Sequence, residues 1–180
     1  MTPSELFAAM SPTLSAEIID YAFAHDKPLY KVTLNEVAGV RKVRPVYLER
    51  QPRAARYATI ASTIARPGMA MSAGNLLTVW LLKKQTPLLI DFLDALKIKH
   101  ENGVVEDLPK SVPDEALHTA LETLLAKYPH ETVAVYLFAF NFMNDAKWAN
   151  LDEQLYTEPR LMLGQPAAPG TDAGPAKADG

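Results

Sequence analysis

The sequence of 180 residues contains no cysteine. Disulfides, thiolate metal ligands and cysteine nucleophiles are therefore excluded, and a protein without disulfides is compatible with the cytoplasm. Long apolar runs are also missing, because the longest one, near Ala134, is about ten residues and a membrane-spanning helix needs roughly 18. The N-terminal residues lack the basic start and apolar block of a secretory signal. We therefore expect a cytoplasmic protein that does not contact a membrane.

Glycine-rich nucleotide loops and metal-ligand motifs are absent as well. The chain contains no G-x-x-x-x-G-K-[ST], no G-x-G-x-x-G in a strand-turn-helix setting and no G-x-S-x-G. Its four histidines, at 25, 100, 118 and 130, include no HExxH motif and no pair at i, i+4 spacing. We expect no cofactor, no metal ion and no catalytic residue. For the less favoured enzyme interpretation, the polar loop with His100, Glu106 and Asp107 is the predicted place of a site.

Positive charge is missing from the start of the chain. Residues 1–26 contain four acids and no lysine or arginine, residues 27–90 contain eleven bases and two acids, and residues 91–180 contain seven bases and fifteen acids. The three segments carry net charges of −4, +9 and −8 within a total of −3. We therefore expect a basic face, or a charge difference along one axis of the molecule.

Helical patterning is what the sequence has in abundance. Thr2-Pro3-Ser4-Glu5 is typical of a capping box with proline at the first helical position. Residues 87–98 place leucines on one face and acids on the other at helical spacing. We expect a single all-α domain of seven to nine helices, packed as antiparallel hairpins over residues 1–160. The segment 161–180, rich in Pro, Ala and Gly, is expected to be a disordered tail.

Two segments are ambiguous between helix and strand. Residues 27–43 favour a helix, although Lys31-Val32-Thr33-Leu34 would also suit a strand. Residues 130–143 are apolar on nearly every side, and so long a stretch without a turn signal favours a buried central helix over a strand. Asn102-Gly103 is expected to end the helix that begins near residue 87.

Six of the aromatic residues between positions 80 and 148 form a candidate cluster. Aromatic side chains supply much of the buried area of a small helical domain, so we expect these to pack in the core. The alternative is that they line a ligand cavity. The residues concerned are Trp80, Tyr136, Phe138, Phe140, Phe142 and Trp148.

The stretch VRKVRPVYLERQPRAAR, residues 40–56, contains six bases and one acid in a chain that is negative overall. Its arginines could bind an acidic protein segment, or neutralise phosphates while Tyr47 stacks on a base. They could equally form a solvated face or pair with acids of the same chain. A helix-turn-helix interpretation is disfavoured because Pro45 falls where the second helix would run. The candidate contact residues are Arg41, Lys42, Arg44, Tyr47, Arg50, Arg53 and Arg56.

We interpret the chain as a non-enzymatic interaction or adaptor protein that binds a protein partner through this basic stretch, residues 41–56. The alternative is a nucleic-acid-associated regulator that uses the same residues. A pI near 5.8 is low for a nucleic-acid-binding domain, which favours the protein partner. The sequence leaves the oligomeric state open.

Three strings in the sequence resemble a family of small bacterial helical proteins of unknown function. They are RKVRPVYLERQPR, GNLLTVWLLKKQTPLLIDFLDALKIKHENGVVEDLP and LLAKYPHETVAVYLFAFN. The resemblance covers residues 13–155 and implies a bacterial, all-helical, stand-alone protein. It implies no activity, cofactor or catalytic residue.

Overall fold

The computed structural model describes residues 1–144 and 147–164, which form ten α-helices, one π-helical turn and no β-strand. The all-α class predicted from the sequence is confirmed. The described part has more helices than the seven to nine expected, because the short segment between Pro45 and Pro52 is also helical. The elements are α1 (Pro3–Ala9), α2 (Pro12–His25), α3 (Lys27–Arg41), α4 (Pro45–Glu49), α5 (Arg53–Ile64), α6 (Ala70–Val79), the π-helical turn η1 (Trp80–Lys84), α7 (Thr86–Ala95), α8 (Asp114–Lys127), α9 (His130–Met143) and α10 (Ala149–Thr157).

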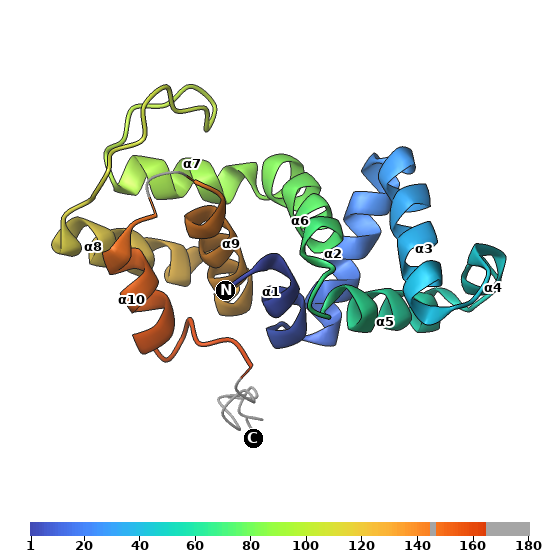
Figure 1. Ribbon diagram of the computed structural model, residues 1–180. Helices are drawn as coiled ribbons and strands as arrows, with labels where there is room; N and C mark the ends of the chain where they lie inside the picture. Colours follow the sequence, from blue (N-terminus) through green and yellow to red (C-terminus); the bar gives the residue numbers. More distant parts are fainter. Residues whose placement is uncertain (145–146, 165–180) are drawn as a thin grey trace, which may run out of the picture.

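The helices form an elongated molecule with two halves (Figure 1). One half contains α2 to α6, with α3 and α5 packed on α2 and α4 at the far end. The other half contains α7 to α10, in which α7 packs on α8 and α9 on α10. Helix α1 lies between them and contacts α5, α6 and α9, while η1 continues α6 into α7. Within the described ranges, no helix has both the length and the apolar content needed to cross a bilayer.

Helix α9 is the buried centre of the second half. Every residue from Val133 to Ala139 is buried, so this segment packs on all sides, as predicted for a central helix rather than a strand. Trp80, Tyr136, Phe138 and Trp148 are almost completely buried. Core packing of the aromatic residues is confirmed for these four, whereas the side chain of Phe142 is 47% exposed.

The helix starts follow the capping signals in the sequence. Thr2 and Glu5 form the predicted capping box, in which the Thr2 amide donates to Glu5 Oε2 at 2.7 Å. Ser11 Oγ accepts from the Leu14 amide at 3.2 Å at the start of α2. Asp26 accepts in the same way at the start of α3, which resolves the ambiguous segment 27–43 as a helix. Caps of this kind stabilise a helix by about 1 kcal/mol each.

The end of α7 differs from the prediction. The helix ends at Ala95, because Lys97 adopts a left-handed backbone with φ 55° and the Ile98 amide bonds back to the Leu93 carbonyl at 2.9 Å. Asn102-Gly103, which we expected to end this helix, instead forms the tight turn of a short hairpin between Glu101 and Val104. Both turn residues have positive φ, and Asn-Gly is the pair that favours such a turn.

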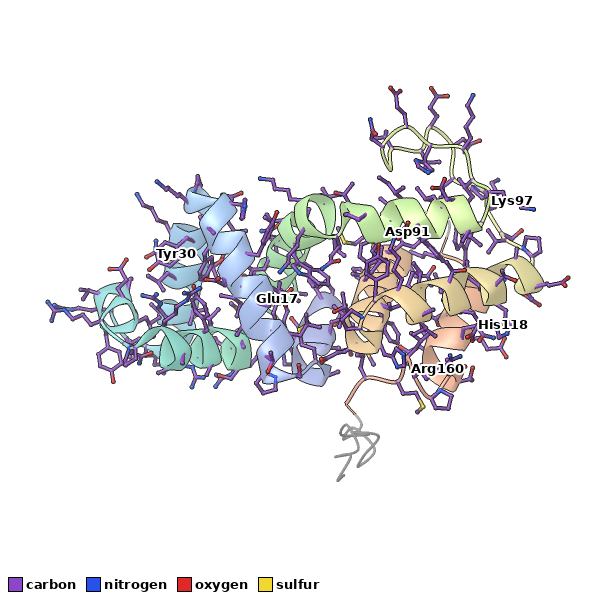
Figure 2. The ribbon with its side chains drawn as sticks, turned by 180° about the vertical axis from the view of Figure 1, so that it is seen from behind. Glu17, Tyr30, Asp91, Lys97, His118 and Arg160 are labelled. Carbon is purple, nitrogen blue, oxygen red and sulfur yellow. The ribbon has the colours of Figure 1, made fainter. Side chains whose placement is uncertain are left out.

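The packed part of the chain extends past residue 160. Arg160, labelled in Figure 2, forms ion pairs with Glu122 of α8 and with Glu158. Leu161 is fully buried. The predicted boundary at 160 therefore falls inside the packed structure. The rest of the predicted tail, 165–180, lies outside the described residues.

Candidate binding surface around helix α4

The chain turns at both ends of α4. Helix α3 ends when Lys42 adopts φ 56°, which lets the Val43 amide bond to the Ala38 carbonyl at 3.0 Å. Pro45 then fixes the first residue of α4, and Pro52 precedes α5. Because α4 contains only five residues between two prolines, it projects from the end of the molecule (Figure 1).

Most apolar side chains of this corner face solvent. In α4 only Leu48 is buried, while Tyr47 is 60% exposed and Val46 is 45% exposed. Val43 is 36% exposed just before the helix. These three side chains, with Arg44 and Arg50, line a hollow of about 370 Å³. We call these five residues the α4 surface. An apolar patch with a polar rim is typical of an interaction site.

Three of the predicted contact residues are bound inside the chain instead. Arg41 donates to Thr63 Oγ1 at 2.8 Å and to Ser62 Oγ at 2.7 Å. Arg53 forms an ion pair with Asp20 of α2, and Arg56 donates to the Glu49 carbonyl at 3.1 Å. These arginines are therefore occupied in holding α3, α4 and α5 in place.

The ion pair of Arg53 is supported by Tyr57, whose hydroxyl donates to Asp20 Oδ1 at 2.8 Å. Partial burial by itself would raise the pKa of Asp20. The hydrogen bonds from Tyr57 and Arg53, together with the positive charge of Arg53, outweigh this effect and lower the pKa below its ordinary value. Asp20 therefore stays ionised and keeps Arg53 turned toward α2.

The other four predicted residues remain available. Within the described residues, the side chains of Lys42, Arg44 and Arg50 form no hydrogen bond or ion pair, and all three are exposed. Arg44 and Arg50 flank Tyr47 on the α4 surface, and Lys42 precedes it. The structure thus brings together unpaired positive charge and exposed apolar area. The sequence analysis missed Val43 and Val46, although a five-residue helix between prolines has room to bury little more than one side chain.

The loop that we considered for an enzyme site is arranged differently. His100 Nε2 lies 3.1 Å from Asp94 Oδ1, and the Gly103 amide donates to His100 Nδ1 at 3.1 Å. Both ring nitrogens are therefore engaged in fixing the hairpin to the end of α7. Glu106 and Asp107 are exposed, and neither forms a hydrogen bond or ion pair with His100 in the described structure. Over the same ranges, no group of three or more His, Cys, Asp or Glu residues could hold a metal ion.

Comparison with protein-family models, with curated proteins and with solved structures found no match for the chain. The resemblance to a bacterial helical family stays a prediction. Any function of the α4 surface must therefore be inferred from its geometry and charge.

Proposed function

We propose that the chain is a non-enzymatic, cytoplasmic protein-binding module whose α4 surface docks an acidic segment of a partner protein. The observation that carries the proposal is the meeting, in one hollow, of exposed apolar side chains with two unpaired arginines. The positive charge of these arginines favours an acidic partner. The hollow accommodates an apolar side chain of that partner. Tyrosine and arginine are also the residues most often found at the energetic centre of interfaces.

The arginines suit a carboxylate-bearing partner for a geometric reason. A guanidinium donates two parallel hydrogen bonds to one carboxylate, and such charge-assisted bonds are about twice as strong as neutral ones. Arg44 and Arg50 have no internal acceptor to give up in the described structure, so binding requires no ion pair to break. Arg53 would have to leave Asp20 first, and we therefore assign it to the fold rather than to the contact.

Nucleic acid is the competing ligand, because Tyr47 between two arginines resembles a stacking platform. Val43 and Val46 favour a protein partner, since exposed valines add nothing to phosphate binding but fill contacts with an apolar side chain. The two ligands also differ in their response to salt, because phosphate contacts release counterions and give a steep salt slope.

Fluorescence anisotropy with three labelled probes tests the proposal. The probes are an acidic peptide with interspersed Leu and Phe, the same peptide with Ser at those positions, and a single-stranded oligonucleotide of equal charge. We expect the first to bind best at about 50 mM salt, and the double variant Arg44→Glu/Arg50→Glu to weaken it at least about tenfold. Lys27→Glu/Lys31→Glu on α3 makes the same charge change away from the hollow and should have a much smaller effect.

If only the oligonucleotide bound, with a steep salt slope, the ligand of the α4 surface would be nucleic acid and not a protein. Equal loss of binding in both double variants would show a general charge effect rather than a site. Failure of all three probes to bind would remove the proposed function.

A further inference from the structure

A second hollow lies in the other half of the molecule, where η1 leads into α7 and faces the C-terminal half of α9. It has a volume of about 170 Å³. Leu81, Leu82 and Leu89 line one side, and Tyr136, Phe140 and Met143 line the other. We call it the η1 groove.

The π-helical turn shapes this groove. The Gln85 amide bonds to the Trp80 carbonyl at 3.1 Å, five residues back, so the turn holds one residue more than an α-helical turn. Leu81 points into the core at 6% exposure, whereas its neighbour Leu82 is left 66% exposed at the rim of the groove. Single π-helical turns inside α-helices are frequent at functional sites.

Helix α2 fixes the turn in place. Lys84 Nζ donates to Glu17 Oε1 at 2.7 Å, and Trp80 Nε1 lies 3.4 Å from the same oxygen. Figure 2 shows Glu17 in the middle of α2. The groove therefore exists before any ligand arrives, which lowers the cost of binding.

The floor of the groove contains a polar group without a partner. Tyr136 is only 3% exposed, and within the described residues its hydroxyl forms no hydrogen bond. Asn144, the other polar residue in the lining, already has partners within the chain: it donates to the Phe140 carbonyl at 2.8 Å and accepts from the Lys147 amide at 2.9 Å. The Tyr136 hydroxyl is therefore a donor without an acceptor in the described chain, in a lining that is mainly apolar.

Burial alone raises the pKa of Tyr136 well above its ordinary value. No hydrogen bond or charged neighbour contributes to this shift, which agrees with the lack of a partner. The hydroxyl therefore keeps its proton at physiological pH and is available as a donor.

We propose that the η1 groove binds a small, mainly apolar molecule about the size of one aromatic ring, whose carbonyl oxygen accepts a hydrogen bond from Tyr136. An apolar cavity of about 150 Å³ can hold benzene, so the volume of the groove fits such a group. Leu81, Leu89 and Phe140 contact its apolar part, and Leu82 and Met143 cover it at the rim. The site is independent of the α4 surface.

Acetophenone and ethylbenzene are a matched pair of probes, because they have the same size and differ by one carbonyl oxygen. Titrations followed by the methyl NMR signals of Leu82 and Met143 give both dissociation constants. We expect acetophenone to bind about 3- to 10-fold more tightly than ethylbenzene. Tyr136→Phe should abolish this preference without lowering the melting temperature, because the lost hydroxyl has no partner in the chain.

Two control variants locate the effect. Tyr47→Phe and Arg44→Glu/Arg50→Glu lie in the other half and should leave both constants unchanged. The proposal is overturned if neither probe shifts the two methyl signals at concentrations up to about 10 mM, or if the probes bind equally well to the wild type. It is also overturned if the preference for acetophenone survives in Tyr136→Phe, or if that variant melts far below the wild type.

Discussion

At the scale of single residues, the lysines that follow α3 and α7 occupy a backbone region that favours glycine. Lys42 and Lys97 both have φ near +55° and end α3 and α7 with the same pair of backbone hydrogen bonds. A side chain with a Cβ costs about 1–2 kcal/mol in this conformation, whereas glycine adopts it freely. Each lysine is therefore a point of local strain at a helix end.

Lys97→Gly should raise the free energy of unfolding by about 0.5–1 kcal/mol, because relief of the strain exceeds the entropy that glycine loses on folding. Lys97 is exposed at the end of α7 (Figure 2), so no packing is removed. Urea denaturation measures the change. Lys99→Gly, two residues on and without a positive φ, should be neutral or slightly destabilising, and a gain there as well would refute the strain explanation.

Asp91 makes the fold sensitive to acid. It accepts hydrogen bonds from Lys127 and Tyr128 and so joins α7 to α8 (Figure 2). Burial by itself would raise its pKa, but these hydrogen bonds and the charge of Lys127 lower the pKa below the ordinary value. A carboxylate with a lowered pKa stabilises the fold above its ordinary pKa of about 3.9 and loses that effect as the pH falls through the lowered value.

Asp91→Asn should therefore cost about 1 kcal/mol at pH 7, a modest value because the pair is partly exposed. The difference between variant and wild type should shrink as the pH falls below about 4, because the carboxylate of the unfolded wild type is protonated there and that of the folded protein follows at its lowered pKa. Unfolding curves between about pH 3 and 7 measure this dependence. A constant difference across that range would show that the amide disrupts packing rather than charge.

At the scale of elements, α4 is too short to be stable by itself. Five residues cannot repay the cost of nucleating a helix, so α4 depends on Pro45 and on the burial of Leu48, which is 1% exposed. Its remaining apolar side chains do not contribute to the core. In α4, Leu48 therefore stabilises the fold, while the exposed apolar side chains are available for contact with a partner.

Leu48→Ala should destabilise the protein by about 2–4 kcal/mol, because it leaves a cavity under α4. Val46→Ala on the same helix should change stability by less than about 0.5 kcal/mol, since Val46 is 45% exposed. It should nevertheless weaken binding of the acidic apolar peptide. If both variants destabilised the protein equally, Val46 would belong to the core and the α4 surface would be smaller than described.

The sequence predicted most elements because their signals are local. Capping residues, prolines and helical spacing indicated α1, α2, α5, α8 and α9 within a few residues. The π-helical turn could not be predicted in this way, because LLTVWLLKK suits an α-helix as well. Its first and last residues contact Glu17, more than sixty positions earlier in the chain.

The candidate site was predictable only in part, for a similar reason. The basic stretch is visible as composition, but spacing does not show which bases are already paired. Arg53 is bound by Asp20 of a preceding helix and Arg41 by Thr63 of a following one. The tertiary fold alone separates these residues from Arg44 and Arg50.

At the scale of the whole molecule, charge is divided between the two halves. Helices α3, α4 and α5 belong to the segment with net charge +9, whereas the second half of α7 and helices α8 to α10 belong to the segment with −8. These two groups lie at opposite ends of the elongated structure (Figure 1). The charge difference expected from the sequence thus runs along the long axis.

This polarity should be visible in chromatography. At pH 7 and low ionic strength, a protein of net charge −3 is expected to pass through a negatively charged resin, yet the α4 end should retain this one. Arg44→Glu/Arg50→Glu should elute at clearly lower salt, and Glu153→Gln at the opposite end should not. Identical elution of all three proteins would show that the α4 end does not contact the resin.

The separation of positive and negative charge between the two ends of the molecule also affects how the protein would meet a partner in solution. A molecule that is positive at one tip and negative at the other rotates in an external field, so a strongly acidic body turns it before the two surfaces touch. Collisions would then occur tip first, with the α4 end leading, and productive encounters would be more frequent than random tumbling allows.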